Sequence, residues 1–450
     1  MLMFDKYKPI ITVNSMLSQA IFRCFDGAVM AAIHRLSFLR NGGRILYKCT
    51  VKVNAVADRK VEPFNDWQPV EVVRPLNAQK GRGAVSNMQG RYEINAREEV
   101  DDGWGGHDEN GSDVAAEVAL PFRTQVTDEV AKSILSRNTS PDIPFNVSLN
   151  PYRGCEHGCI YCFARPSHSY LGLSPGLDFE SRLYAKVNAA ELLRRELAKP
   201  SYVPEHIAIG VNTDAYQPCE RERRLTRQVL EVLSECHHAV GLVTKSALIE
   251  RDIDLLAPMA ARQLACAAIT ITTLDPAIAR TLEPRAAAPA RRLRTIETLA
   301  RAGIPVSVSV APIIPFVTEP EIEKILEAAR DAGAVGAHYV VLRLPWEVNP
   351  LFQEWLQAHF PERAQRVMNR VRDLRGGKDY DSDFGKRMHG EGIWADLIRQ
   401  RFTKAVERLG MGGLRSRFDK LDVAQFRRPL VVPPGVAKKD AKGAGQLDLF

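Results

Sequence analysis

The sequence has few cysteines, no long apolar run, and no internal repeat beyond a recurring alternation of short strands and helices. Only 8 of its 450 residues are cysteine, which is too few for a disulfide scaffold in a chain of this length. No stretch reaches the roughly 18 consecutive apolar residues of a membrane span. With 45% hydrophobic and 26% charged residues, the composition is that of a globular protein. We therefore expect a cytoplasmic protein that does not enter a membrane.

Acidic residues are scarce at the N-terminus. Residues 1–60 contain three Asp and no Glu against ten Lys and Arg. Two interpretations fit this bias: an organellar presequence, or a doubtful or disordered segment that was appended and does not pack. Residues 61–140 are polar and glycine-rich and predict a poorly ordered approach segment. The net charge of +7 permits binding to a polyanion without demonstrating it.

From about residue 141, short β-rich runs alternate with amphipathic stretches. The runs lie at 146–149, 207–211, 240–244, 265–272, 306–311 and 338–343. Asn188 with Glu191, and Thr318 with Glu321, resemble capping boxes at the starts of two helices. This pattern predicts an α/β fold, a (β/α)₆ partial TIM barrel over residues 141–350, with its chemistry at the carboxyl ends of the strands. Residues 351–410 predict a helical C-terminal extension, and residues 411–450 a flexible basic tail.

Three of the cysteines lie within eight residues, directly after the first run, in the segment NPYRGCEHGCIYCFARP. Thiolates at this spacing can hold three corners of a 4Fe-4S cluster and leave the fourth iron open to an outside ligand. We expect Cys155, Cys159 and Cys162 to be these ligands. Tyr161 would offer an apolar face to a bound nucleoside.

Other interpretations of the cysteines stay open at this point. A zinc site usually takes four ligands, and His157 would have to be the fourth. A four-cysteine cluster would need a partner from elsewhere in the chain, namely Cys24, Cys49, Cys219, Cys236 or Cys266. Chance clustering of buried cysteines is the third alternative.

The cysteine segment resembles the hallmark of the radical S-adenosylmethionine (SAM) superfamily, CxxxCxΦC after the first strand of a partial barrel. The resemblance implies that the amino and carboxylate groups of SAM bind the open iron. It also implies that reduction by an electron donor releases a 5′-deoxyadenosyl radical.

Between about Lys80 and Gly410, further segments resemble one branch of that superfamily, the family related to spore photoproduct lyase and often labelled "DNA repair photolyase". Within that branch the likeness is to an uncharacterised bacterial subgroup. The segments are SPGLDFESRLYAKVNA, NTDAYQP, VTKSAL, TTLDP, LEPRAAAPARRL, APIIP and RLP.

Polar residues that follow the second and third strands are candidates for binding SAM. Asn212, Thr213 and Asp214 can hydrogen-bond its amino group, although an Asx turn explains them equally well. Lys245 can pair with its carboxylate, and the resemblance places a cofactor-contacting lysine at this position. The alternative for Lys245 is a surface lysine.

The fourth strand and the segment after it add further candidates. Thr270 and Thr272 share one face of the strand and would suit ribose or carboxylate contacts, unless they are ordinary buried threonines. Arg292 matches an arginine of the family, and we expect it to anchor the cofactor. Arg285 and Arg291 can simply be solvated.

One position departs from the family pattern. Spore photoproduct lyase has a hydrogen-donating cysteine near the position of Val211 or Asn212, and neither is a cysteine here. Cys219 lies a few residues on, but its setting, QPCERER, indicates a helix start. The thymine-dimer activity of that enzyme is therefore not expected to carry over.

Three accounts of function follow. The first is a radical SAM enzyme acting on a nucleic-acid lesion or modification. The second is the same chemistry on a protein or metabolite, and the third is a non-catalytic nucleic-acid-binding iron–sulfur protein. Basic residues in KGRGAVSNMQGR and GGKDYDSDFGKRM can contact phosphates, or these segments are solvated loops.

The last five residues, Gln446, Leu447, Asp448, Leu449 and Phe450, resemble the QL(S/D)LF peptide that binds the bacterial DNA-polymerase sliding clamp. Two leucines and a phenylalanine supply apolar anchors, and the glutamine amide supplies hydrogen bonds. A chance apolar terminus is the alternative. Clamp binding would favour a DNA substrate.

Overall fold

The computed structural model describes residues 32–41, 44–52, 78–93, 123–413 and 420–430. The chain divides into two units, Met1–Val73 and Arg74–Phe450. In the first unit, strands β1 (Ala32–Asn41) and β2 (Arg44–Lys52) pair antiparallel. The segment boundaries expected from the sequence stay predictions, and the peptide at residues 446–450 lies outside the described residues.

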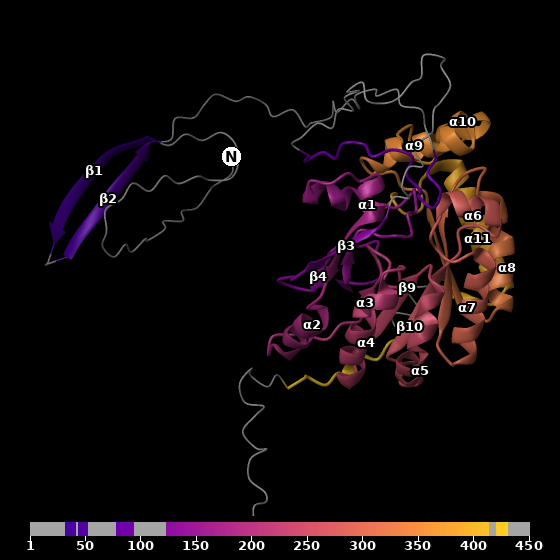
Figure 1. The fold of residues 1–450 in the computed structure, drawn as a ribbon, viewed down its shortest axis with the longest axis horizontal. Coiled ribbons are helices and arrows are strands. Elements are labelled where there is room, and N and C mark those ends of the chain that lie inside the picture. The colour runs from indigo at the N-terminus through magenta and orange to yellow at the C-terminus, as the bar shows by residue number, and fades with distance from the viewer. Residues whose placement is uncertain (1–31, 42–43, 53–77, 94–122, 414–419, 431–450) are drawn as a thin grey trace, which may run out of the picture. The chain divides into compact units, whose positions relative to one another are not determined.

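The second unit is built on an eight-stranded sheet with the order β13-β12-β11-β10-β9-β8-β5-β4 (Figure 1). Strands β5 to β12 of this sheet run parallel, and β4 runs antiparallel to β5. The six central strands are the six predicted runs, so the predicted α/β fold with its partial barrel is confirmed. Among the described strands, β4 and β13 are the two edges and the sheet does not close. The bounds are β4 (Leu135–Arg137), β5 (Val147–Leu149), β8 (Ile207–Ile209), β9 (Val240–Thr244), β10 (Ala265–Thr270), β11 (Val306–Ile313), β12 (Gly336–Val341) and β13 (Gly412–Gly413).

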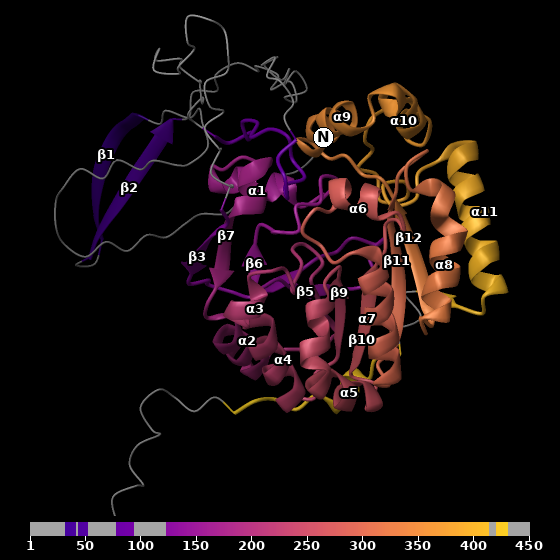
Figure 2. The same cartoon turned by 45° about the vertical axis from the view of Figure 1, so that its right-hand side comes forward.

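Helices connect the parallel strands and cover one face of the sheet. Helices α7, α8 and α11 lie along the outside of the strands, α9 and α10 lie at one end, and α5 lies at the other (Figure 2). A small second sheet joins β3 (Gln125–Glu129), β7 (Arg182–Lys186) and β6 (Tyr152–Arg153). The α-helices are α1 (Leu177–Ser181), α2 (Ala189–Ala198), α3 (Glu220–Arg223), α4 (Leu225–Glu235), α5 (Ile253–Ala261), α6 (Pro276–Leu282), α7 (Pro289–Arg301), α8 (Ile322–Asp331), α9 (Val348–His359), α10 (Pro361–Asp373) and α11 (Gly392–Arg408). The 3₁₀ helices are η1 (Arg165–Leu171), η2 (Ala247–Asp252), η3 (Glu319–Glu321) and η4 (Val423–Gln425).

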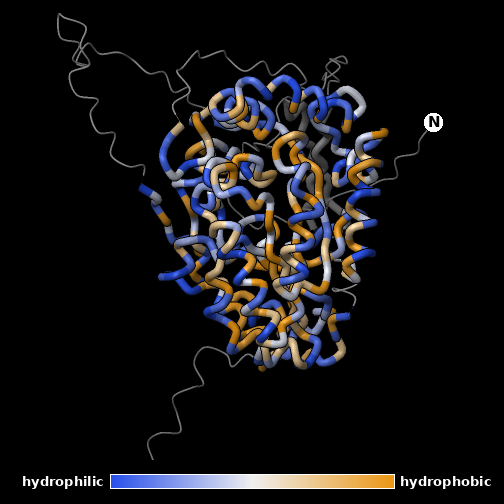
Figure 3. Tube along the Cα trace, turned by 90° about the vertical axis from the view of Figure 1, so that its right-hand side faces the viewer, coloured by the Kyte–Doolittle hydropathy of each residue, from blue (hydrophilic) through white to orange (hydrophobic). Residues whose placement is uncertain are grey.

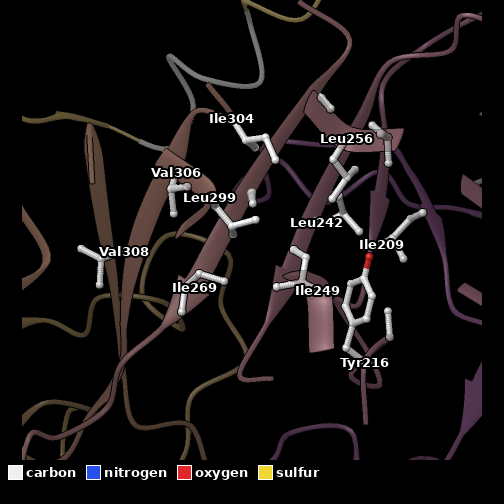
Figure 4. Packing of buried hydrophobic residues seen from close by; sticks show 14 of the residues in the cluster. Ile209, Tyr216, Leu242, Ile249, Leu256, Ile269, Leu299, Ile304, Val306 and Val308 are labelled. Carbon is white, nitrogen blue, oxygen red and sulfur yellow. The ribbon is translucent and has the colours of Figure 1, made fainter. Parts of the chain in front are cut away.

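The main core lies between the sheet and its helices. Because side chains alternate along a strand, Val306, Val308 and Val310 of β11 pack under the helices and are at most 1% exposed. Figure 4 shows this layer, in which Ile269 of β10 and Leu299 of α7 belong to the same cluster as Val306 and Val308. In Figure 3 the apolar stretches concentrate in the interior and the polar stretches outside. The opposite face of each strand is left to line the inside of the barrel.

The two predicted capping boxes are wrong in their contacts, although both helices begin close to where they were expected. Asn188 precedes α2 without capping it, because its side-chain amide exchanges two 2.9 Å hydrogen bonds with the backbone of Ala131. Thr318 precedes η3 and its hydroxyl accepts from Ile314 N at 2.8 Å. In both cases tertiary contacts take the side chain away from the helix end.

Within the described residues, no helix combines the length and the apolar character that crossing a bilayer requires.

Candidate active site

The three cysteines lie on the loop between β6 and η1, immediately beyond the first parallel strand. Cys155 and Cys159 are each 7% exposed and Cys162 is half-buried. Gly154 and Gly158 have φ of 74° and 66°, a region that favours glycine. A Cβ on Gly154 would come within 2.6 Å of a Leu183 methyl group, so the tight curl of the loop depends on the missing side chain.

A buried ion pair holds this loop from behind. The Arg165 side chain is fully buried and pairs with Glu180. Other N–H groups of Arg165 donate to the carbonyls of Gly158 at 3.1 Å and Cys159 at 2.9 Å. Removing one partner of such a pair typically costs about 3–5 kcal/mol, because it leaves the other charge buried alone. Arg165 and Glu180 therefore fix the path of the cysteine loop.

Residues 78–93 pack against the same loop. The backbone N–H groups of Gly83 and Ala84 donate to the Glu180 carboxylate at 3.0 and 2.9 Å. A Cβ on Gly83 would lie 1.9 Å from the Gly158 carbonyl oxygen, so the two backbones touch. Arg82 is 7% exposed and donates to the Glu180 carbonyl at 2.8 Å. Arg82 is thus a buried part of the protein rather than a solvated side chain or a free phosphate contact.

The second basic segment also makes contacts within the protein. Arg387 forms two 2.6 Å hydrogen bonds with Asp142. Lys386 pairs with Glu391 at 2.8 Å. These two cations of GGKDYDSDFGKRM are therefore paired within the chain.

The NTDAYQP segment after β8 supports the loop from another side. The buried Gln217 amide accepts from Glu156 N at 2.8 Å and donates to the Gly154 carbonyl at 3.2 Å. Asp214 lies 3.2 Å from Nδ1 of the buried His157. Asp214 also accepts from Lys245 N at 2.8 Å. Burial by itself raises the pKa of Asp214, but His157 and these donors bring it well below its usual range, so Asp214 is a carboxylate.

Behind Cys162, a polar group is centred on Glu283. This carboxylate is 3% exposed, pairs with Arg292, and accepts from the hydroxyls of Tyr161 and of Thr272, the latter at 2.6 Å. Burial opposes ionisation, but Arg292 and Lys245 outweigh it and lower the pKa of Glu283 to about 2. Glu283 is therefore an anion at neutral pH and ties the last turn of the cysteine loop to β10.

Lys245 lies beside both groups. Its ammonium is 5.9 Å from the centre of the Tyr161 ring. Burial alone would lower the pKa of Lys245, but Cys159, Glu283 and Asp214 raise it overall. A protonated lysine next to the cysteine loop can meet a carboxylate.

The donor set fits a thiolate-bound cluster. Burial raises the pKa of Cys155, and it raises the pKa of Cys159 to about 12, so both are neutral thiols without a metal, and binding a metal would release their protons. Within the described residues, no three His, Cys, Asp or Glu side chains are placed to share a single metal ion. Three soft sulfur donors on one tight loop suit an iron–sulfur cluster.

The structure thus brings together most residues that the sequence singled out. Tyr161, Asp214, Lys245, Thr272 and Arg292 meet around the cysteine loop, and Thr270 adjoins them through its carbonyl, which accepts from Arg292 at 3.0 Å. Thr213 is buried and donates to the Tyr152 carbonyl at 3.1 Å, while Asn212 is exposed.

Arg285 contacts the cysteine loop itself, since it pairs with Glu156 at 3.1 Å and its backbone N–H donates to the His157 carbonyl at 3.3 Å. Two residues stand apart from this group. Arg291 pairs with Glu250 at 2.5 Å. Cys219 is the N-cap of α3, which confirms the expected helix start.

The sequence analysis missed the supporting residues Arg165, Glu180 and Gln217, and it did not assign a role to Glu283. All three lie inside the quoted segments, and a polar residue close to a metal loop is a signal for such support. Nothing in the sequence indicated which of their partners they would meet.

The fold and the site define a class: an α/β partial barrel whose first strand is followed by a loop with three metal-binding cysteines. Residues 149–329 match the Radical SAM superfamily. That superfamily uses a 4Fe-4S cluster and SAM, which favours a cluster over zinc or chance clustering for the three cysteines.

Known relatives share about half of this chain. An uncharacterized protein of Mycobacterium tuberculosis (strain ATCC 25618 / H37Rv) is 35% identical over 226 residues, which are 50% of this chain and 66% of that protein. An uncharacterized protein of Methanocaldococcus jannaschii is 24% identical over 223 residues, 50% of this chain and 80% of that protein. The chain therefore matches just under two thirds of the mycobacterial relative.

Solved structures show weaker likenesses. Spore photoproduct lyase complexed with dinucleoside spore photoproduct aligns with a TM-score of 0.43 and 14% identity, over 64% of this chain and 81% of that chain. The radical SAM methyltransferase TsrM from Kitasatospora setae aligns with a TM-score of 0.34 and 12% identity, over 66% of this chain and 55% of that chain. No residue role is carried from either structure.

Proposed function

We propose that this enzyme cleaves SAM reductively and acts on a lesion or modification in a nucleic acid, in the cytosol. The observation that carries the first part is the buried three-cysteine loop, held by the Arg165–Glu180 pair within a radical SAM domain. Cys155, Cys159 and Cys162 would hold the cluster. When bound, the cluster supplies the electron, taken from a reductant, that converts SAM to a 5′-deoxyadenosyl radical.

The chain's own residues would bind and orient SAM. Lys245 is the cation placed to pair with the carboxylate of SAM, and Asn212 is exposed at the end of β8 to meet its amino group. Asp214, Thr272 and Arg292 already have protein partners, so we assign them the task of positioning Lys245, Tyr161 and the cysteine loop. Of the other two predicted residues, Thr213 donates to the Tyr152 carbonyl and the Thr270 carbonyl accepts from Arg292, so we assign both a supporting role.

An exposed group of aromatic and arginine side chains supports a nucleic-acid substrate. We call Arg91, Tyr92, Tyr170 and Trp346 the aromatic–arginine patch. Tyr92, Tyr170 and Trp346 are 52%, 67% and 61% exposed, the two tyrosine rings stack at 5.0 Å, and Arg91 lies 4.3 Å from the Trp346 ring. Stacking on such rings is how unpaired bases are held without sequence preference.

Two residues of the aromatic–arginine patch belong to segments that follow the cysteine loop or a strand of the barrel in the sequence. Tyr170 belongs to η1, which follows the cysteine loop, and Trp346 follows β12. Phe163, the residue after Cys162, is 46% exposed with Arg343 5.1 Å from its ring.

The test is formation of 5′-deoxyadenosine by the anaerobically reconstituted enzyme, with and without single-stranded DNA and RNA carrying damaged or modified bases. We expect one class of nucleic acid to stimulate turnover and to change in mass. Lys245→Ala should weaken SAM binding tenfold or more without loss of iron, whereas the exposed Lys199→Ala should not. The substrate class would be contradicted if the enzyme cleaves SAM but no nucleic acid stimulates this cleavage and none is altered by it.

The C-terminal peptide adds a partner to this proposal. A DNA-polymerase sliding clamp that binds residues 446–450 would bring the enzyme to DNA, with an affinity of micromolar order, about −8 kcal/mol. Calorimetry with the full chain should show binding that disappears when Leu449 and Phe450 are deleted. Equal heats for both proteins would remove the clamp from the account.

A further inference from the structure

The inner face of the barrel carries polar side chains that the site described above does not use. Pairing of β10 with β11 sets Thr270 beside Ser309, and pairing of β11 with β12 sets Ser309 beside His338. These three residues form a row across neighbouring strands, about 4.8 Å apart from strand to strand. Ser307 lies two residues below Ser309 on the same face. All point away from the helix-covered core, because Val308 and Tyr339 pack under the helices.

None of these groups has a hydrogen-bond partner among the described residues, and one of them is fully buried. Ser307 and Ser309 are 2% and 4% exposed as whole residues, but their hydroxyl oxygens are not fully buried. Nδ1 of His338 is buried and equally unpartnered. A buried polar group without a hydrogen bond costs about 1–3 kcal/mol, and such groups in native proteins are usually satisfied by a ligand or water.

Access to the face distinguishes it from a sealed core. On β12, the helix-facing Tyr339 and Val341 are buried, whereas the inward-facing His338 and Val340 are partly exposed. Val243 of β9 faces the same way and is also partly exposed. The side chains between the polar groups are small, with Ala268 and Gly336 flanking Ser307. The face is therefore not sealed from solvent at β9 and β12.

The chemistry of the row favours an uncharged ligand. Hydroxyls both donate and accept. Burial, with a smaller effect from His389, lowers the pKa of His338 to about 4, so its imidazole is neutral at pH 7. No inward position of β10, β11 or β12 among the described residues carries a formal charge, and the nearest cation in register is Lys245 after β9. At Ser307, Ser309 and His338 a phosphate or carboxylate would find no counter-charge, because Lys245 and Arg292 lie at the Thr270 end of the row.

We propose that Ser307, Ser309 and His338 form a subsite that binds the uncharged, hydrogen-bonding edge of a nucleobase. The row lies two residues below Thr272, which contacts Tyr161 and Glu283 at the level of the cysteine loop. A base held there would sit beneath the loop, inside the barrel. The choice of a nucleobase rests on the proposed function, whereas the polar row itself does not.

The test measures binding of thymidine, deoxycytidine, deoxyadenosine and deoxyguanosine to the reconstituted full chain by equilibrium dialysis. At least one should bind, and Ser309→Ala and His338→Phe should each weaken it about tenfold. His338→Asn, which keeps a polar atom near the position of Nδ1, should restore most of the affinity. The matched substitutions Thr298→Ala on α7 and His237→Phe beyond α4 should leave binding unchanged.

Thermal unfolding gives a second readout. If the Ser309 hydroxyl is unpartnered in the free protein, Ser309→Ala should have the same melting temperature as wild type or a higher one. A drop of several degrees would show a structural hydroxyl and overturn the proposal, as would wild-type protein that binds none of the four nucleosides. Equal binding of methyl 2-deoxyriboside would also overturn it, because recognition would then lie in the sugar.

Failure of the subsite and failure of the proposed function are distinguishable. Wild-type protein that forms 5′-deoxyadenosine from SAM but binds none of the four nucleosides would contradict the subsite alone. An enzyme that binds a nucleoside but never cleaves SAM would contradict the proposed function alone.

Discussion

At the scale of single residues, the site depends on side chains that are buried with an opposite charge or a hydrogen bond. Glu283 is a buried anion because Arg292 and Lys245 lie beside it. Asp214 is also a buried anion, because His157 faces it and it accepts hydrogen bonds from Tyr216 N, Lys245 N and the Thr244 hydroxyl. Both carboxylates lie next to the cysteine loop, so their charge balances Lys245 and holds it protonated.

The first prediction concerns the cluster ligands. Cys155→Ala, Cys159→Ala and Cys162→Ala should each lose the oxygen-sensitive 4Fe-4S absorption and bound iron, because a corner of the cluster loses its thiolate. Cys236→Ala is the matched control, since Cys236 is also buried but ends α4. Iron retained at wild-type level by any of the first three variants would remove that cysteine from the ligand set.

A second residue-scale prediction concerns acid stability. His238 is fully buried, with Nε2 2.7 Å from the Tyr202 hydroxyl and Nδ1 3.0 Å from the Ala239 carbonyl. Burial lowers its pKa to about 4; the Ala239 carbonyl opposes this and His206 adds to it. The unfolded chain, with a pKa near 6.5, therefore binds more protons than the folded one. The stability this residue contributes is present above about pH 6.5 and is lost as the pH falls toward 4.

From pH 7 to pH 5, the free energy of unfolding should fall by about 2 kcal/mol through His238 alone. Urea unfolding at both pH values should show a smaller fall for His238→Gln than for wild type. His338, whose pKa is lowered in the same direction, is present in both proteins and does not affect the comparison. Identical pH dependence for the two proteins would contradict a neutral buried His238.

At the scale of elements, loops at one end of the parallel strands converge on the cysteines. The loop itself follows β5 and β6, Gln217 follows β8, Lys245 follows β9, and Glu283 follows α6. Residues 78–93 close the loop from outside the barrel through Glu180. The cysteine loop is therefore positioned by four separate connections rather than by its own sequence.

Replacing Gly83 tests this arrangement. Gly83→Ala places a Cβ 1.9 Å from the Gly158 carbonyl oxygen, so residues 78–93 must shift away from the loop. We expect a loss of about 1–3 kcal/mol in stability and faster release of iron in the presence of a chelator. Gly413→Ala, where nothing lies within 4 Å of the added Cβ, is the control. Equal iron release by both variants would show that the segment does not support the loop.

The parts that the sequence predicts are those with a local signal. The six strands could be predicted because each is a short β-rich run between amphipathic stretches. The three-cysteine motif could be found because its residues are contiguous in the sequence. The side-chain contacts of Asn188 and Thr318 went wrong because a local capping signal competed with tertiary hydrogen bonds. The Arg165–Glu180 pair and the Thr270–Ser309–His338 row could not be predicted, since both depend on which strands and loops become neighbours.

At the scale of the whole molecule, the radical SAM domain covers residues 149–329, while the aromatic–arginine patch draws on residues on both sides of it. Arg91 and Tyr92 come before the domain, and Trp346 comes after it. Glu347 links these flanks, accepting from Arg91 Nε at 2.7 Å and from Ser169 at 3.1 Å. The flanking segments thus contribute an outer surface that the domain alone lacks.

If this surface receives an unpaired strand, single-stranded DNA should bind more tightly than duplex, and its affinity should fall steeply with salt. Trp346→Ala and Tyr170→Ala should each weaken binding by about 5- to 100-fold, the usual range for a stacked base. Fluorescence anisotropy with a labelled oligonucleotide measures both effects. Val203→Ala, at an equally exposed residue between α2 and β8, should bind like wild type, and loss of affinity there as well would contradict a defined binding surface.

The central claim, that Cys155, Cys159 and Cys162 hold a cluster that cleaves SAM, is tested most directly by product analysis. Wild-type protein and Cys159→Ala, both reconstituted anaerobically, are incubated with dithionite and SAM, and 5′-deoxyadenosine is measured by mass spectrometry. The account predicts 5′-deoxyadenosine from wild type and none above background from the variant. Wild-type protein that carries four irons per chain yet forms no more 5′-deoxyadenosine than Cys159→Ala would contradict it.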